Sequence, residues 1–237
     1  MPQMRLDKLL SHLNCGSRKE VQALIRAGRV SVDGTVQKDP AFKVDPDRSQ
    51  TAVDGTVQRY RAQRYYMLNK PMGVITASRD ERHDTVLELF PAELRRGLFA
   101  VGRLDKDTEG LLLLTDDGPL GHALLSPKRH VDKVYLARVD GVVDQSDVEA
   151  LARGMVLGDG LHCLPAGLEP LEDGRVCLVT LREGKYHQVK RMMAARGKPV
   201  TYLKRLSMGP LRLDAALAPG EWRPLTREEV LSLSRFG

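Results

Sequence analysis

The stretch GRLDKDTEGLLLLTDDG, residues 102–118, places a charged loop directly before an apolar run. Leu111–Leu114 is an unbroken run of leucines, and the turn signal Asp116–Asp117–Gly118 follows it, so this segment predicts a buried strand. Asp105 lies in the loop that enters the strand, next to Leu104, the single large apolar side chain of that loop. The position alone fits both a turn residue and a carboxylate held for chemistry.

Length and charge bound the class of protein. With 237 residues, the chain can bury one sizeable core, or one core and a small accessory domain. The 37 Lys and Arg residues exceed the 31 Asp and Glu residues and give a formal net charge of +6. This surplus fits a polyanionic partner and an ordinary basic surface equally well.

Cysteine usage and hydropathy indicate the compartment. Cys15, Cys163 and Cys177 form no C-x-x-C pair and have no histidine at the spacing of a zinc site, so we expect reduced thiols. The sequence shows no signal-peptide pattern and no run of about 18 apolar residues. We therefore expect a soluble, cytoplasmic protein with no membrane partner.

Two amphipathic helices and a hairpin are expected near the N-terminus. Over residues 4–14, leucines recur at the helical spacing i, i+3, i+4 and i+7. Ser17 is placed to cap a second helix over Arg18–Ala27. Residues 30–36 then predict two short strands around an Asp33–Gly34 turn.

Basic residues gather on this helical segment. Helical spacing predicts that four of them, Arg18, Lys19, Arg26 and Arg29, share one arc of the second helix. Such an arc suits the phosphate backbone of a nucleic acid, although a solvated helix face has the same composition. The candidate RNA-binding residues of this segment are Arg5, Lys8, Arg18, Lys19, Arg26 and Arg29.

The stretch RLDKLLSHLNCGSRKEVQALIRAGRVSVDGTVQ resembles the S-four-type RNA-binding domain. The resemblance covers about residues 4–50 and implies structured RNA as the ligand. Residues 45–64 are polar and contain a second Val-Asp-Gly turn, so we expect a linker that ends near Arg64, and we expect no internal repeat. The predicted domains are an RNA-binding domain with its linker at 1–60 and a larger domain at 61–237.

Strands dominate the larger domain, and helices are interspersed without the regular alternation of a parallel sheet. We therefore predict an α+β fold on a mostly antiparallel or mixed sheet. The predicted strands are residues 65–68, 133–139 and 175–181, and residues 69–73 are a predicted loop. The predicted helices are residues 86–89 with a Thr85–Glu88 capping box, residues 187–196, and a last helix capped by Thr226 and Glu229.

Three residues form a candidate catalytic set. A carboxylate attacks carbon only when it is ionised, positioned and partly stripped of water, and a nearby cation keeps it ionised. Asp105 offers the carboxylate, and Lys190 lies beside the apolar arc of the helix predicted over 187–196, so we expect its ammonium group within salt-bridge distance of Asp105. The third residue is Tyr135, in the strand predicted over 133–139; taken singly, the three would be a turn residue, a solvated lysine and a core aromatic.

Three ordered motifs resemble the signatures of the pseudouridine synthases. They are G-R-L-D-x-x-T-x-G-L-L-L-L-T-D-D-G, then K-x-Y, then E-G-K-Y-H-Q-V-K-R-M. With L-N-K-P-x-G before them and P-G-E-W-R-P-L-T after them, the likeness extends over nearly the whole chain. The subgroup with an S-four-type domain in front modifies ribosomal RNA, and T-D-D-G, S-P-K-R-H-V-D-K-V-Y and H-Q-V-K-R are most similar to its members that act on small-subunit 16S rRNA.

The resemblance implies roles for the candidate set. Asp105 is the implied nucleophile, Tyr135 packs against or stacks on the uracil, and Lys190 pairs with the Asp105 carboxylate. Such enzymes isomerise uridine without a metal or another cofactor, and the target uridine must leave its stack to reach the carboxylate. The other expectations are RNA contacts for Arg103 and Arg191, a loop-shaping role for Asp107 and Thr108, and a structural or RNA-facing role for His187.

The implied substrate is a specific uridine of 16S rRNA (a uridine-516-type site), in free rRNA or in a partly assembled small subunit, and we expect a monomer. A large-subunit 23S rRNA uridine is the alternative target. Two other classes stay open. A non-catalytic, ribosome-associated RNA-binding protein needs no carboxylate–ammonium pair, whereas a hydrolase that uses Asp105 on a glycosidic bond needs a second carboxylate, such as Asp107 or Glu109.

Overall fold

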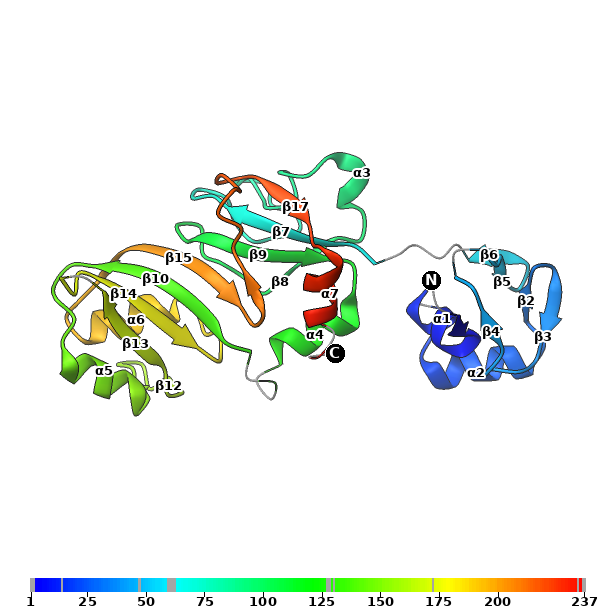
Figure 1. Cartoon of the computed structure of the whole chain (residues 1–237), viewed down its shortest axis with the longest axis horizontal. Helices are drawn as coiled ribbons and strands as arrows, with labels where there is room; N and C mark the ends of the chain where they lie inside the picture. Colours follow the sequence, from blue (N-terminus) through cyan, green and yellow to red (C-terminus); the bar gives the residue numbers. More distant parts are fainter. Residues whose placement is uncertain are drawn as a thin grey trace. The chain divides into compact units, whose positions relative to one another are not determined.

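The computed structural model describes residues 3–13, 15–46, 48–58, 63–126, 129, 131–171, 173–233 and 235. These residues fall within two compact units, Met1–Ala62 and Gln63–Gly237 (Figure 1). The sequence-based boundary between residues 60 and 61 lies close to this division. Each unit has a hydrophobic core made of its own residues.

Two helices contribute most of the buried core of the first unit. α1 (Leu6–His12) packs against α2 (Arg18–Arg26). Ser17 caps α2 as predicted, in a reciprocal capping box with Glu20. The buried core between the helices and the strands is Leu6, Leu9, Leu10, Val21, Ile25, Val30, Val32 and Val44.

Both helices are shorter than predicted. Residues 4 and 5 are not helical, because β1 (Met4–Arg5) pairs with β4 (Lys43–Val44). Asn14, the last residue of the first predicted helix, lies outside the described residues. The prediction that Arg29 shares the basic arc of α2 is wrong, because Gly28, with a φ of 72°, ends the helical course of the chain before it.

Two consecutive hairpins form a four-stranded sheet in the order β3–β2–β5–β6. The expected linker is therefore wrong over residues 51–58, which form the second hairpin. The six residues V-D-G-T-V-Q occur in both hairpins, contrary to the expectation of no internal repeat, and both turns have an Asp at a φ of 50° followed by a positive-φ Gly. The strands are β2 (Val30–Val32), β3 (Thr35–Gln37), β5 (Thr51–Val53) and β6 (Thr56–Gln58).

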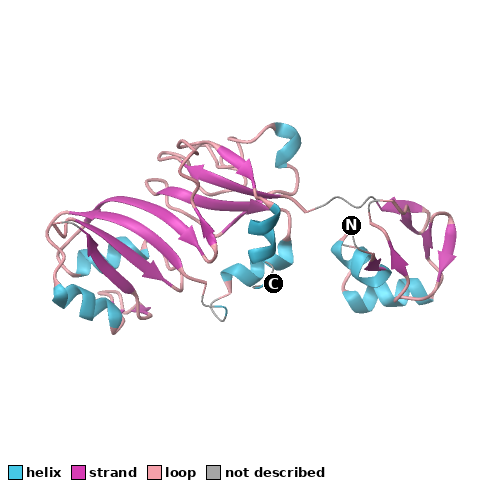
Figure 2. Ribbon diagram, in the orientation of Figure 1, coloured by secondary structure: helices cyan, strands magenta, loops and turns pink. Residues whose placement is uncertain are grey.

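A nine-stranded sheet forms the frame of the second unit (Figures 1 and 2). Its main order is β13–β14–β10–β15–β9–β7–β17, with β16 beside β15 and β8 beside β9. Among the described strands, only β15 and β9 pair in parallel, which confirms the predicted α+β class with a mixed sheet. The strands are β7 (Tyr65–Lys70), β8 (Phe99–Val101), β9 (Glu109–Thr115), β10 (Lys133–Val139), β13 (Gly167–Leu171), β14 (Val176–Leu181), β15 (Val200–Met208), β16 (Leu211–Arg212) and β17 (Trp222–Pro224), and β11 (Met155–Val156) pairs separately with β12 (His162–Cys163).

This sheet is buried on both faces, and β9 shows why. Leu112 and Leu114 belong to the core on one face, whereas Leu111 and Leu113 belong to the core on the other. The unbroken leucine run therefore fills two cores at once. Helices α5 (Gln145–Ala152) and α6 (Gln188–Ala195) contribute side chains to the first of these cores, and α4 (Gly118–Leu125) and α7 (Arg227–Leu233) contribute side chains to the second. The remaining helix of this unit in the described residues is α3 (Ala92–Arg95).

The helix predicted over residues 86–89 is absent. These residues form hydrogen-bonded turns, although the N–H of Thr85 donates to the expected partner, the Glu88 carboxylate, at 2.6 Å. Pro91 disfavours a helical conformation at the residue before it, which leaves too few residues for an α-turn to propagate. The other predicted elements of this unit are present within a few residues of their predicted ends, including the reciprocal Thr226–Glu229 cap of α7.

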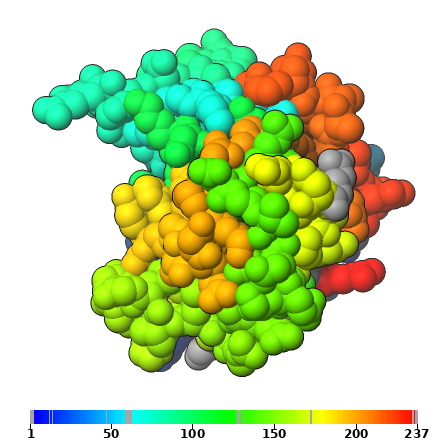
Figure 3. Space-filling view, turned by 90° about the vertical axis from the view of Figure 1, so that its left-hand side faces the viewer, coloured from blue at the N-terminus to red at the C-terminus, as the bar shows by residue number. Residues whose placement is uncertain are grey.

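One exposed segment of the second unit projects from its surface, and the chain has free cysteines in both units. None of the helices in the described ranges is long and apolar enough to cross a membrane. The exposed residues 78–84, between β7 and α3, project from the rest of the unit as the cyan-green segment in Figure 3. Cys163 and Cys177 are buried free thiols. Cys15 of the first unit is a half-buried free thiol.

Candidate active site

The loop that carries Asp105 ends where β9 meets β15. At this point Gly110 pairs with Arg205 and has a φ of 102°, a conformation that favours glycine. A Cβ atom on Gly110 would lie 2.3 Å from the carbonyl oxygen of Arg205. Only glycine fits this close approach, so the glycine of the D-x-x-T-x-G motif fixes the end of the loop.

A buried ammonium group holds the loop from the side of β7. Lys70 is fully buried, and its Nζ donates to the carbonyl oxygens of Asp105 at 2.9 Å and Thr108 at 2.8 Å. Burial lowers the pKa of Lys70 to about 8. The prediction that Lys70 lies in a loop is wrong, because β7 continues through it and pairs it with Gly110. Sequence reasoning gave Lys70 no role, although a lysine directly after an apolar strand, in L-N-K-P-x-G, was a signal.

The segment after β7 fixes the residue before the nucleophile candidate. Thr76 and Leu104 are joined twice, because Oγ1 of Thr76 donates to the Leu104 carbonyl at 2.8 Å and accepts from the Leu104 N–H at 3.1 Å. The N–H of Gly73 donates to the carbonyl of Lys106 at 2.9 Å. The backbone on both sides of Asp105 is thus held by hydrogen bonds, which positions its side chain in advance.

The Asp105 carboxylate is paired with the predicted cation. Nζ of Lys190 lies 3.1 Å from Oδ2 of Asp105, which confirms the predicted salt bridge. The same ammonium group contacts Asp107, and this hydrogen bond is the main reason that the pKa of Asp107 lies below its usual value. Nε2 of His187 lies 3.5 Å from Oδ1 of Asp105. His187 and Lys190 belong to the N-terminal turn of α6, where the helix dipole favours an anion.

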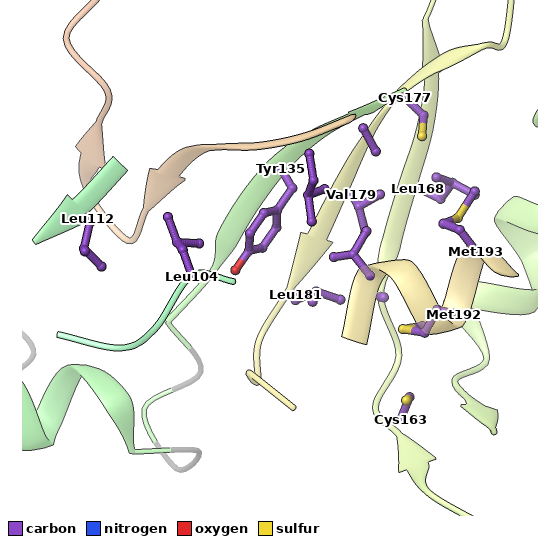
Figure 4. Packing of buried hydrophobic residues seen from close by; sticks show 14 of the residues in the cluster. Leu104, Leu112, Tyr135, Cys163, Leu168, Cys177, Val179, Leu181, Met192 and Met193 are labelled. Atoms are coloured by element: carbon purple, nitrogen blue, oxygen red, sulfur yellow. The ribbon is translucent and has the colours of Figure 1, made fainter. Parts of the chain in front are cut away.

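Tyr135 reaches the same region from β10. Its ring is buried in the first core, beside Leu104 and close to Val179 and Leu181 (Figure 4). Leu104 belongs to the same core as Tyr135 and directly precedes Asp105 in the chain. The structure therefore brings Asp105 and Lys190 into direct contact, and it places Tyr135 in the core that includes Leu104.

The predicted RNA-binding residues form two groups. In the first group, each side chain already has a carboxylate partner: Arg5 and Arg18 contact Asp7, Arg29 contacts Asp54, and Arg191 contacts Asp159. In the second group, the side chains are exposed and show no ion pair in the part of the chain that the structure describes; these are Lys8, Lys19, Arg26 and Arg103. The second group is thus available to a phosphate backbone without breaking an existing pair.

The geometry does not favour the hydrolase alternative. Glycosidases need a second carboxyl group that stays protonated and acts as the acid. Asp107 has a lowered pKa, the opposite of this requirement. Glu109 is occupied, because Oη of Tyr202 donates to its Oε2 at 2.7 Å. Asp107 is therefore not suited to act as the acid, and Glu109 already has a hydrogen-bond partner.

Comparisons with known proteins agree on one family. Residues 64–195 match the family described as RNA pseudouridylate synthase, and residues 4–48 match the S4 domain. The uncharacterized RNA pseudouridine synthase YtzG of Bacillus subtilis (strain 168) is 49% identical over 96% of this chain and 97% of that protein. Ribosomal small subunit pseudouridine synthase A is 44% identical in Pseudomonas aeruginosa and 43% identical in Escherichia coli (strain K12), in each case over 97% of this chain and 100% of that protein.

A solved structure supports the same conclusion. A chain described as a crystal structure of pseudouridylate synthase has a TM-score of 0.71 and 36% sequence identity, and the match covers 97% of this chain and 99% of that chain. The likeness thus includes both units and the loop, strand and helix that form the Asp105 site. This chain belongs to the RNA pseudouridylate synthase family, whose members are isomerases, and it carries an S4 domain in front of the synthase domain.

Proposed function

We propose that this protein converts a specific uridine of small-subunit 16S rRNA to pseudouridine, with Asp105 as the nucleophile. In this reaction the N-glycosidic bond breaks, the uracil turns, and C5 of the base bonds to the ribose carbon, while C5 loses its proton and N1, which has lost its bond to the ribose, gains one. Nothing is oxidised and no group is transferred to water. The protein therefore has to supply a positioned nucleophile and a site for a base that has left its stack.

The observation that carries this proposal is the ion pair between Asp105 and Lys190 on a loop held from both sides. Lys190 places a positive charge 3.1 Å from Oδ2 of a carboxylate that is partly shielded from water, which orients this carboxylate for attack on carbon. Lys70 fixes the backbone of the same loop, which keeps the carboxylate in place. Tyr135 packs against the uracil from the side of β10. A protein that only binds RNA has no use for this arrangement.

The choice of small-subunit rRNA rests on the relatives. Those from Pseudomonas aeruginosa and Escherichia coli are named for the ribosomal small subunit and match this chain over nearly its full length. The substrate is free 16S rRNA or a partly assembled small subunit, and a uridine-516-type site is the proposed target. We also propose that the protein works as a monomer in the cytoplasm, where ribosomal subunits are assembled.

Mapping pseudouridines in rRNA from cells with and without the gene tests the target. Loss of one pseudouridine in 16S rRNA, at the uridine-516-type site, is the expected result. Loss of a pseudouridine in 23S rRNA alone would move the activity to the large subunit. Unchanged maps of both rRNAs would contradict the proposal.

The substitution Asp105→Asn tests the nucleophile. It keeps the shape of the side chain and removes the charge, so RNA should bind with near-normal affinity while isomerisation falls below detection. Release of tritium from 16S rRNA labelled at C5 of uracil measures the reaction, and filter binding measures the affinity. Turnover by the variant, with deamidation to Asp excluded by mass spectrometry, would show that Asp105 is not the nucleophile.

A further inference from the structure

An aromatic pair beside the nucleophile has no part in the chemistry proposed above. The rings of Tyr186 and His187 stack with their centroids 3.8 Å apart and an interplanar angle of 16°. His187 approaches the Asp105 carboxylate at 3.5 Å. Tyr186 is 75% exposed, more than any other large apolar side chain in the described residues. The exposed ring of Tyr186 is therefore stacked on the ring that approaches Asp105, the proposed nucleophile.

The exposure of Tyr186 does not come from a loose loop. Oε1 of Glu183 accepts from Nε2 of Gln188 at 2.6 Å and from the N–H of Leu164 at 2.8 Å. Oε1 of Gln188 accepts from the N–H of Lys185 at 3.0 Å. These bonds tie the segment between β14 and α6 to its surroundings on both sides of Tyr186.

The backbone beside Tyr186 is also set in an unusual conformation. His187 has a φ of 49°, in the left-handed region that residues with a Cβ rarely adopt. Such a conformation persists only when the surrounding structure supports it, and supported strain is concentrated at functional sites. The orientation of the two rings is therefore a built feature of this segment.

We infer that Tyr186 stacks on the base next to the target uridine and helps to select the substrate, an inference that rests on the proposed function. When the target uridine leaves its stack to reach Asp105, the neighbouring base loses a stacking partner. The outer face of Tyr186 replaces that partner, and stacking of a base on an aromatic side chain contributes about tenfold or more to affinity. Arg103 and Lys106 are exposed on either side of Asp105 and bind the phosphates of the same nucleotides.

Kinetics on a 16S rRNA transcript labelled with tritium at C5 of uracil test this inference. Tyr186→Ala should raise KM about tenfold and change kcat by less than about threefold, whereas Tyr186→Phe and Tyr186→Trp, which keep a ring, should stay close to the unsubstituted protein. Val142→Ala is the matched control, because Val142 is also an exposed apolar side chain (50%) but lies on the loop after β10. Its KM should not change.

A cross-linking experiment gives a second readout that does not depend on turnover. With photoreactive benzoylphenylalanine in place of Tyr186, illumination of the complex with the transcript should link the protein to a nucleotide adjacent to the modified uridine. Cross-links elsewhere on the RNA would overturn the inference. So would an unchanged KM for Tyr186→Ala, or a fall in kcat alone, which would mean that Tyr186 acts through His187 and not on RNA. If the unsubstituted protein has no activity on the transcript, the proposed function fails instead.

Discussion

At the scale of single residues, one ammonium group serves two unequal carboxylates. Lys190 contacts both Asp105 and Asp107, but the Asp107 side chain is 69% exposed and that of Asp105 is 28% exposed. Ion pairs of exposed carboxylates are weakened by water and salt, whereas partly buried ones are screened less. Salt should therefore weaken the pair with Asp107 more than the pair with Asp105.

Lys190→Met should remove the positive charge that pairs with the Asp105 carboxylate and cut kcat by at least about a hundredfold, since a lost charge-assisted pair in a partly buried site costs several kcal/mol. Lys190→Arg should keep part of the activity, because it keeps the charge but changes the geometry. Asp107→Asn is the control and should change kcat by less than about threefold. If Lys190→Met and the unsubstituted protein have equal rates, the pair is only structural.

Sequence reasoning found some of these residues and missed others for a physical reason. The position of Lys190 followed from helical periodicity, because the neighbouring apolar residues had to face the core and left Lys190 at the edge. Lys70 and His187 could not be found in this way. The role of Lys70 depends on which carbonyl groups face it where β7 pairs with β9. The position of His187 depends on its left-handed backbone conformation. Neither feature follows from residue types.

At the scale of elements, the parallel pairing of β9 with β15 depends on the absence of a side chain at Gly110. Gly110→Ala should lower the free energy of unfolding of the second unit by about 3 kcal/mol or more, because the added Cβ collides with the backbone of Arg205 and the positive φ is strained. Urea unfolding followed by the fluorescence of Trp222, the one tryptophan of the chain, measures this loss.

The control for this substitution is Gly197→Ala. Gly197 also has a positive φ, of 71°, but a Cβ there would meet no atom within 4 Å. Its loss of stability should be limited to about 1–2 kcal/mol, the contribution of the backbone conformation. Equal losses for the two variants would mean that the close approach at Gly110 does not stabilise the sheet.

Acid should loosen the first unit through the contact between α1 and α2. Asp7 is buried and accepts from Arg5 and from Gln22, and these contacts lower its pKa to about 2 from the model-peptide value of 3.8. A depressed carboxyl pKa contributes stability above the unfolded pKa, so about 2 kcal/mol is lost as the pH falls from about 4 to about 2. NMR signals of the buried leucine methyl groups should report this loss, and Asp7→Asn should abolish its pH dependence.

The elements also show where local pattern was insufficient. The leucine run of β9 and the capping residues of α2 and α7 led directly to those elements, because their signals are local. The second hairpin was taken for a linker for two reasons. Its outer strand, β6, is largely exposed, and its inner strand, β5, pairs with β2, which lies about twenty positions earlier in the chain. Comparison with the first hairpin, which has the same V-D-G-T-V-Q sequence, would have revealed it.

At the scale of the whole molecule, the S4 domain and the synthase domain have separate hydrophobic cores. Deleting residues 1–60 should leave the second unit folded, because its two cores contain none of the deleted residues. The affinity for 16S rRNA should fall, and its dependence on salt should become less steep, because several phosphate contacts are lost. Titrations at a series of salt concentrations measure both effects. An affinity and a salt slope equal to those of the full chain would show that the first unit does not bind this RNA.

The ion pair between Asp105 and Lys190 joins positions 85 residues apart, and its cation comes late in the chain. During synthesis, domains fold from the N-terminus as they emerge, so the RNA-binding unit is complete long before the ribosome has made α6. A nascent or prematurely ended chain would thus hold RNA while it lacks the cation that pairs with Asp105, the proposed nucleophile. Such a chain would occupy the substrate without converting it, so each truncated product acts as a competitor of the finished enzyme.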